Sequence, residues 1–308
     1  MKYRFIKQYL ILSFILFSTF FSKKGVVGQK KDTISKMDKI SYNNCYFPIE
    51  NKNIRIIHLI ITRFLNEFST YNGFPKRLYT DEYLMNGIRV MKKYLLPSLE
   101  KQFCKNFIWI LMLGEKANLT LVKSLLDLNY SFETEIVYQK NIKNYIKNKS
   151  KDFDFLITTR IDYDDIIYYD SVNDVRKLIN IKHPILLHGY NRGYFYMESM
   201  DKYYNFYNNF NNKGIMSIFI SLILNLNKVN DTYTVYDLGN HVIIKEELLR
   251  NYKKFGIKEL DYDPFVIDNG SPKFIYVRQN HSFAHNTSGQ FPKNLKSIDL
   301  NISKFYGF

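Results

Sequence analysis

Short apolar runs alternate along the chain with segments in which apolar residues recur every three or four positions. The runs predict strands, and the three-or-four spacing predicts helices with one apolar face. The predicted strands are 54–61, 107–113, 133–138, 153–159, 184–188, 193–197, 233–236 and 274–277. The predicted helices are 84–99, 119–128, 171–181 and 245–252. Strands that alternate with helices indicate an α/β fold, with a mostly parallel central sheet flanked by helices in a Rossmann-like arrangement.

Other segments give weaker signals. The apolar stretch 215–226 fits a strand or a helix, and the Lys- and Asn-rich segment 140–151 predicts a loop. Pro97 is expected to kink the end of the first helix, because proline cannot donate a helical hydrogen bond. The turn at 190–192 is expected to join its two neighbouring strands as a hairpin.

The N-terminus has the pattern of a targeting segment. Three basic residues precede the apolar run 9–21, and two lysines follow it. The run is shorter than the roughly 20 residues that span a bilayer. We therefore expect a signal peptide or signal-anchor at 1–28, a polar stem at 29–52 and a globular domain at 53–308. The expected location is the secretory pathway, lumenal or membrane-anchored (type II), or secreted, and a buried helix is the alternative for the apolar run.

Composition narrows the class of partner. Hydrophobic residues make up 46% and aromatic residues 17% of the chain, which excludes disorder of its main body. The net charge of +15 is spread along the sequence, and no nucleic-acid-binding module is recognisable, so no nucleic acid partner is expected. Cys45 and Cys104 are too few for a disulfide framework or a cysteine-only zinc site, but could pair in a secreted chain.

An acidic turn follows the predicted strand 153–159. Arg160 is followed there by Asp162, Asp164 and Asp165. The carboxyl ends of parallel strands are where open α/β sheets bind ligands. Paired carboxylates suit a divalent metal such as Mn²⁺ or Mg²⁺, and a neighbouring arginine suits a diphosphate. The alternative is a solvated acidic loop or a helix cap.

The run Thr-Thr-Arg-Ile-Asp-Tyr-Asp-Asp at 158–165 resembles the "TTRxDxDD" signature of the putative rhamnosyltransferase family. That family is assigned to the GT-A-type glycosyltransferases, which use nucleotide sugars. Further similar stretches lie at 60–64, 94–102, 107–110, 219–222 and 280–286. The resemblance covers roughly 54–290, although only the Thr-Thr-Arg stretch is specific.

The resemblance implies a GT-A-like domain, and together with the acidic turn and the predicted helix and strand ends it suggests roles for individual residues. The candidate metal ligands are Asp162, Asp164, Asp165, His281 and His285; the candidate nucleotide-sugar contacts are Thr62, Arg63, Arg89 and Arg160; the candidate catalytic bases are Asp237 and Glu198. Each of these has a plain alternative, since isolated histidines, arginines and carboxylates are commonly surface or structural residues.

The sequence therefore predicts a glycosyltransferase that moves a sugar, with rhamnose as one candidate, from a nucleoside-diphosphate donor to a carbohydrate or glycoprotein acceptor. A GT-A arrangement would place the 184–197 hairpin beside the acceptor pocket. Two alternatives remain open. One is another metal-dependent enzyme acting on phosphorylated substrates, such as a nuclease or phosphohydrolase. The other is a secreted sugar-binding module without catalysis.

Overall fold

The computed structural model describes residues 45, 54–64, 80–126, 129–207, 219–239, 244–278 and 296–307. All of these belong to one compact unit, residues 42–308. The expected targeting segment and stem lie outside the described residues, apart from Cys45. In the ranges given above, no helix has the length and apolar character needed to cross a membrane.

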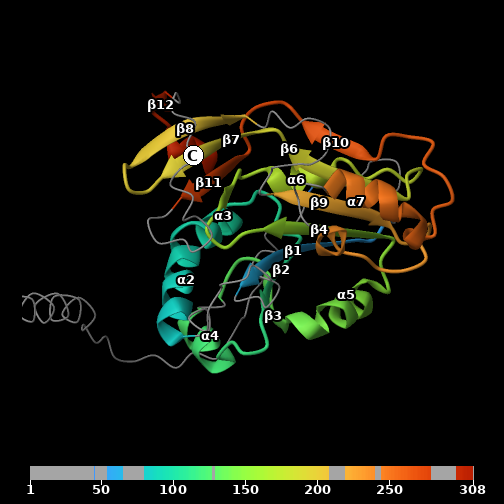
Figure 1. The fold of residues 1–308 in the computed structure, drawn as a ribbon, viewed down its shortest axis with the longest axis horizontal. Coiled ribbons are helices and arrows are strands. Elements are labelled where there is room, and N and C mark those ends of the chain that lie inside the picture. The colour runs from blue at the N-terminus through green and yellow to red at the C-terminus, as the bar shows by residue number, and fades with distance from the viewer. Residues whose placement is uncertain are drawn as a thin grey trace, which may run out of the picture. The chain divides into compact units, whose positions relative to one another are not determined.

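The larger of two sheets has seven strands in the order β10-β6-β9-β4-β1-β2-β3 (Figure 1). Its strands are β1 (Ile56–Phe64), β2 (Ile108–Leu113), β3 (Glu133–Tyr138), β4 (Phe155–Ile161), β6 (Ile185–Tyr190), β9 (Ile220–Asn225) and β10 (Phe265–Asp268). Neighbouring strands are parallel except at β9, which is antiparallel to β4 and β6. The prediction of a mostly parallel central sheet is confirmed.

The smaller sheet has five strands in the order β12-β8-β7-β11-β5. They are β5 (Ile166–Ile167), β7 (Arg192–Met197), β8 (Lys202–Tyr207), β11 (Phe274–Arg278) and β12 (Ser297–Ile298). β11 is parallel to β7, and the other pairings are antiparallel. Because β5 directly follows the acidic turn, this sheet holds the turn from its far side.

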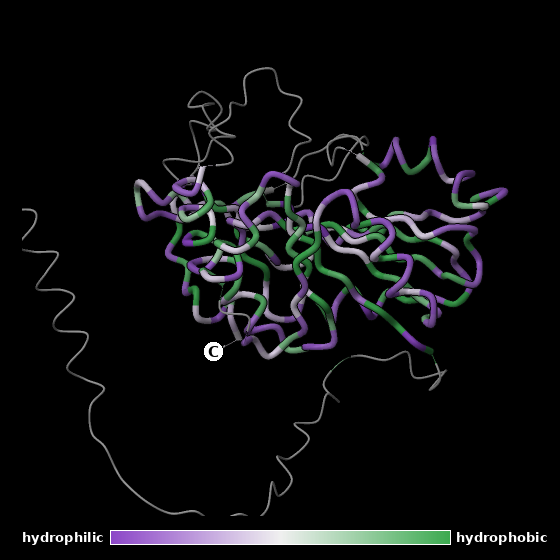
Figure 2. The backbone as a smooth tube through the Cα atoms, turned by 90° about the horizontal axis from the view of Figure 1, so that it is seen from below, coloured by the Kyte–Doolittle hydropathy of each residue, from purple (hydrophilic) through white to green (hydrophobic). Residues whose placement is uncertain are grey.

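Helices cover both faces of the larger sheet. They are α2 (Asp81–Lys93), α3 (Leu95–Glu100), α4 (Leu119–Leu125), α5 (Ile142–Ser150), α6 (Ser171–Arg176), α7 (Ile244–Asn251) and α8 (Ile302–Phe305), with short 3-10 helices η3 (Gln139–Asn141), η4 (Val235–Leu238) and η5 (Tyr252–Phe255). Apolar side chains of α2, α3, α4 and α6 join the core on one face, and those of α5, η4 and α7 join the core on the other. Figure 2 shows hydrophobic positions concentrated along the strands of the interior.

The two cores arise from the alternation of side chains along each strand. In β1, Ile56, Ile60 and Phe64 face one core, and Ile57 and Leu59 face the other. Successive side chains of a strand point to opposite faces, so a strand buried on both sides is read as a continuous apolar run. This is why the central strands are visible in the sequence.

The segment predicted as a loop at 140–151 is largely helical, so that prediction is wrong. Its lysines and asparagines conceal an apolar stripe formed by Ile142, Tyr145 and Ile146. The spacing of three and four residues places all three on one face of α5, against the core. Ile146 is fully buried.

The predicted hairpin at 184–197 does not form. β6 belongs to the larger sheet and β7 to the smaller one, and the chain crosses between them at Asn191. β7 forms its hairpin with β8 instead. A glycine is required at 193, because a Cβ there would overlap the ring of Phe274 on β11. The prediction that this hairpin lies beside an acceptor pocket is therefore wrong as well.

Three further boundaries differ from the predictions. The first helix breaks at Tyr94 rather than kinking at Pro97, which lies in the first turn of α3 where its missing N–H is not needed. The predicted strand 233–236 is replaced by η4, which a capping box between Thr234 and Asp237 begins. α4 and α6 are shorter than predicted.

Cys45 and Cys104 form a disulfide with a Cα–Cα distance of 4.7 Å. Both sulfurs belong to the core that α2, α3 and α4 cover. The bridge holds the residues before β1 against the chain that leads into β2.

Candidate functional site

Arg63 and Arg160 lie on one face of the larger sheet, at the carboxyl ends of adjacent strands. β1 and β4 are parallel, with Ile61 opposite Arg160. Arg63 therefore falls on the same face, two residues further along β1. The side chain of Arg160 is 5% exposed. The two predicted nucleotide contacts are thus brought together.

The ring of Tyr236 lies against both guanidinium groups. The carbon centres of these groups are 4.9 Å (Arg63) and 5.4 Å (Arg160) from the ring centroid. The Tyr236 hydroxyl donates a hydrogen bond of 2.9 Å to the carbonyl of Ile61, which fixes the ring beside β1. Burial raises the pKa of Tyr236 to about 12, so the hydroxyl stays neutral. The ring restricts the conformations of both arginine side chains.

Asp162 and Asp164 follow Arg160 in the acidic turn, and Asp162 stands next to it. Nη2 of Arg160 is 3.9 Å from Oδ1 of Asp162, whose side chain is 41% exposed. Burial, and secondly the negative charge of Asp162, raises the pKa of Asp164 to about 7. Arg278 acts in the opposite direction. Two carboxylates that disfavour each other's charge are suited to a bound cation, which would relieve that repulsion.

Asp165 joins the acidic turn to the second sheet. Its side chain is fully buried, and Oδ1 accepts a hydrogen bond of 3.2 Å from the backbone N–H of Val277 on β11. Oδ2 has no hydrogen-bond partner within the part of the chain that the structure describes. Burial, followed by the charges of Asp164 and Asp162, raises the pKa of Asp165 well above its ordinary value. The geometry gives Asp165 an anchoring role behind the two other carboxylates.

Arg278 is a site residue that the sequence analysis missed. Its guanidinium carbon lies 4.7 Å from the ring centroid of Tyr276 and 5.8 Å from that of Phe195. Its charge acts on both Asp164 and Asp165. In the sequence, only its position at the end of the predicted strand 274–277 could have suggested a role in the site. The pairing of β11 with β5 shows that this strand end lies near the acidic turn.

Thr62 faces the other side of the sheet from Arg63 and Arg160, and Arg89 belongs to α2. Thr62 is fully buried, and its hydroxyl accepts a hydrogen bond of 3.0 Å from Nε1 of Trp109 on the opposite face of the sheet. Arg89 is exposed on α2. Thr62 and Arg89 stay predicted nucleotide-sugar contacts.

The two candidate bases are engaged in other interactions. Oδ2 of Asp237 accepts hydrogen bonds from the backbone N–H of Thr234 at 2.7 Å and from its hydroxyl at 3.0 Å, completing the cap of η4. Oε1 of Glu198 accepts hydrogen bonds of 2.7 Å from both Lys93 and the Tyr94 hydroxyl. The backbone N–H of Glu198 bonds to the carbonyl of Arg278, so Glu198 lies near the end of β11.

The predicted metal ligands are only partly described. His281 and His285 lie outside the described residues. Within the described ranges, no three side chains of histidine, cysteine, aspartate or glutamate come together as a metal-binding group. What the structure offers is a pair of carboxylates, Asp162 and Asp164, of which Asp162 lies beside Arg160. Such a pair can bind a cation that is itself bound to phosphate oxygens.

Comparison with known proteins identifies one family. Residues 55–237, more than half of the chain, match a family model described as "Putative rhamnosyl transferase". Among curated proteins, none matches the chain significantly.

Several solved structures are similar at low identity. The inositol-1-phosphate CTP transferase from T. maritima is 12% identical, with a TM-score of 0.35, over 72% of this chain and 89% of that chain. HddC from Yersinia pseudotuberculosis is 15% identical, with a TM-score of 0.37, over 72% and 93%. S. aureus TarS 1-349 is 12% identical, with a TM-score of 0.33, over 73% and 60%.

Proposed function

The chain belongs to the family described as "Putative rhamnosyl transferase" and is a glycosyltransferase, and from this we propose that it transfers a sugar from a nucleoside-diphosphate donor to a carbohydrate or glycoprotein acceptor. The observation that supports the proposal most is the group of Arg63, Arg160 and Tyr236 beside Asp162. Rhamnose is the donor sugar that the family description suggests.

Transfer from such a donor leaves a nucleoside diphosphate, and negative charge accumulates on the leaving phosphate. Fixed cations that face this charge lower the barrier, because they need no rearrangement as the bond breaks. Arg63 and Arg160 are held in place by the Tyr236 ring before any ligand arrives. We propose that their N–H groups bind the diphosphate oxygens, which planar guanidinium groups match well.

The residues present also fit a divalent metal. Asp162 and Asp164 supply two carboxylates, and burial together with the charge of Asp162 raises the pKa of Asp164 to about 7, a rise that a bound cation would oppose. When bound, Mn²⁺ or Mg²⁺ would add positive charge next to the leaving diphosphate. Asp165 would hold the turn in position through Val277.

Proton removal from the acceptor hydroxyl needs a base, and Asp237 and Glu198 remain the proposed candidates. Asp237 is exposed and directly follows Tyr236, whose ring contacts the arginine pair. Glu198 lies near Arg278 but is held by Lys93 and Tyr94. His281 and His285 remain proposed further metal ligands.

We extend the proposal to the compartment. The Cys45–Cys104 bridge supports an oxidising location, because disulfides persist mainly in secreted and lumenal proteins. This agrees with a secretory-pathway location and with a targeting segment at 1–28.

The test is thermal unfolding of the chain with UDP, GDP, CDP or dTDP, each with and without Mn²⁺. A ligand that binds only the folded state stabilises it by ~2.7 kcal/mol at about 100 times its Kd. We expect one nucleotide to raise the Tm only when Mn²⁺ is present, and Asp164→Asn to abolish that rise. Asp261→Asn, the same change at an exposed aspartate, is the matched control.

The result also separates the alternatives. Incubation with the nucleotide sugar of the responding base completes the test: release of nucleoside diphosphate with a matching gain of sugar on an added acceptor glycan supports transfer, whereas hydrolysis of the donor that is indifferent to acceptor indicates a phosphohydrolase. Absence of any nucleotide response in the wild-type chain would overturn the transferase proposal.

Arg63→Gln is expected to weaken binding of the responding nucleotide by about ten-fold or more. A hydrogen bond to a charged partner contributes about 1.5–3 kcal/mol, and about 1.4 kcal/mol is a factor of ten. Calorimetric titration would measure the change, with Arg250→Gln on α7 as the control. An unchanged Kd in Arg63→Gln would remove Arg63 from the site.

A further inference from the structure

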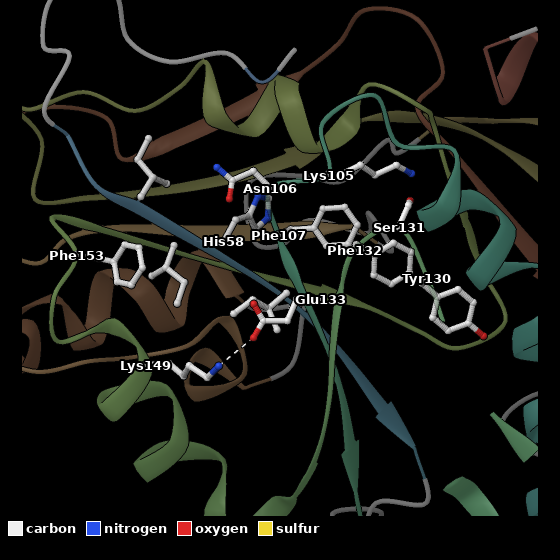
Figure 3. A pocket seen from close by; sticks show the side chains of 13 residues that line it. His58, Lys105, Asn106, Phe107, Tyr130, Ser131, Phe132, Glu133, Lys149 and Phe153 are labelled. Atoms are coloured by element: carbon white, nitrogen blue, oxygen red, sulfur yellow. Dashed lines mark hydrogen bonds and ion pairs between the residues drawn. The ribbon is translucent and has the colours of Figure 1, made fainter. Parts of the chain in front are cut away.

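A pocket of about 450 Å³ lies at the opposite edge of the larger sheet, where β1, β2 and β3 begin (Figure 3). Ile57 lines it, and Ile57 and Arg63 are six residues apart on β1. With a rise of about 3.3 Å per residue, the pocket is roughly 20 Å from the arginine pair. It cannot be part of the donor site.

One wall of the pocket is a row of aromatic rings. Phe107 and Phe132 stack with centroids 5.0 Å apart, and Phe132 and Tyr130 stack at 5.2 Å with nearly parallel planes. Figure 3 shows the three rings in succession along one side. Trp109 does not line the pocket itself. Its ring centroid lies 6.5 Å from that of Tyr130 and 6.5 Å from that of Phe132, in T-shaped contacts. The rings hold one another in place, and because Phe107 and Phe132 are only 4% and 6% exposed, the half-buried Tyr130 is the most accessible ring of this apolar wall.

The remaining lining is polar and mixed in character. Asn106, Ser131 and Glu133 have exposed side chains, which provide an amide, a hydroxyl and a carboxylate. His58 also lines the pocket. It is 1% exposed, and its Nε2 bonds to Thr159 while Nδ1 has no hydrogen-bond partner among the described residues. A hydroxyl group can satisfy that nitrogen in either tautomer, because it both donates and accepts.

The two lysines that line the pocket already interact with carboxylates or backbone carbonyls. Lys149 is 3.0 Å from Glu133 and 3.5 Å from Glu135. The ammonium group of Lys105 donates to the carbonyls of Leu99 and Glu100 at the end of α3. No cluster of available positive charge is left among the residues that line the pocket, so an anionic ligand is disfavoured.

An aromatic wall bordered by hydrogen-bonding groups of both kinds, with little net charge, matches a polyhydroxylated ring whose C–H face is apolar and whose edge is polar. We propose that this pocket is a second carbohydrate site, which binds a neutral part of the acceptor or product glycan away from the point of transfer. The inference rests on the proposed function, since a transferase acting on a glycan gains from holding its chain at a second point.

The only tryptophan of the chain provides a direct test. Trp109 packs against the wall of the pocket, so occupancy should alter its fluorescence. We would titrate the full chain, without nucleotide, with maltotriose, chitotriose and methyl α-L-rhamnoside, and separately with inorganic phosphate. A saturable change with at least one of the sugars, and none with phosphate, is expected.

Glu133→Gln and Asn106→Ala should each weaken the sugar response by about ten-fold, as expected when a charged or polar hydrogen bond is lost. Both positions are exposed, so folding should be kept, and Glu259→Gln is the matched control. No response to any of the three sugars, a response to phosphate instead, or a sugar response unchanged in both variants would overturn the second site.

The two proposals fail separately. A nucleotide-dependent Tm shift without a sugar response leaves the donor site and removes the second site. A sugar response without any nucleotide shift leaves a carbohydrate-binding chain and removes the proposed transfer.

Discussion

Replacing both Cys45 and Cys104 with alanine is expected to lower the free energy of unfolding by about 4 kcal/mol. The bridge joins residues 59 positions apart, and a loop of that size loses this much conformational freedom in the unfolded chain. Both cysteines are buried, at 6% and 1% exposed, so some packing is lost as well. Urea unfolding of the oxidised wild type and the double variant would measure the difference.

Reduction provides the control for the cysteine variant. The wild-type chain should shift to lower urea midpoint with a reductant, whereas the double variant should not respond. If the wild-type midpoint is the same with and without reductant, the bridge does not contribute to stability. Because Cys104 precedes Lys105 and Phe107 in the wall of the aromatic pocket, reduction should also weaken the sugar response.

The central strands could be predicted because burial on both faces leaves continuous apolar runs. β2 and β3 fall within a residue of their predicted ranges, and β1 and β4 extend past their predicted ends. The extension at β4 includes Arg160, a charged residue that periodicity excludes from a strand. It is buried there because Tyr236 packs against it, and no local pattern contains that contact.

The errors share one cause, which is that contacts between distant segments decided the local structure. The two strands joined by a short turn at 190–192 fit a hairpin, yet each finds its partner in a different sheet. α5 is hidden by composition, although its apolar spacing was present. The capping pattern of Thr234 and Asp237 was also present, and it outweighs the strand preference of the tyrosines.

The candidate site shows the same division. The sequence grouped Arg160 with Asp162 and Asp164, because these residues lie within four positions of one another along the chain. It also assigned Arg63 through the end of a strand. It could not find Tyr236 or Arg278, which reach the turn only through η4 and β11.

Acidification is expected to destabilise the protein through His188. Burial lowers the pKa of His188 to about 4, with Lys273 acting in the same direction and Asp268 and Asp174 opposing it. The unfolded chain takes up a proton near pH 6.5, but the folded chain does not. Stability is therefore complete above about pH 6.5 and falls by ~1.4 kcal/mol per pH unit below it, until the folded-state pKa is reached. At about pH 5 the loss from this one residue is ~2 kcal/mol.

Urea unfolding at about pH 7 and about pH 5 would test this, with comparison of the wild type and His188→Gln. The glutamine cannot take up a proton, so its variant should lose ~2 kcal/mol less on acidification, whatever its stability at neutral pH. His183→Gln, at a partly exposed position, is the matched control and should follow the wild type. Buried His58, whose pKa is also lowered by burial, keeps part of the acid sensitivity in every variant.

Equal acid losses in the wild type and His188→Gln would show that His188 is protonated in the folded chain. If His188→Gln does not fold, NMR titration of the wild-type imidazole distinguishes the two cases, because a neutral ring should persist to about pH 5.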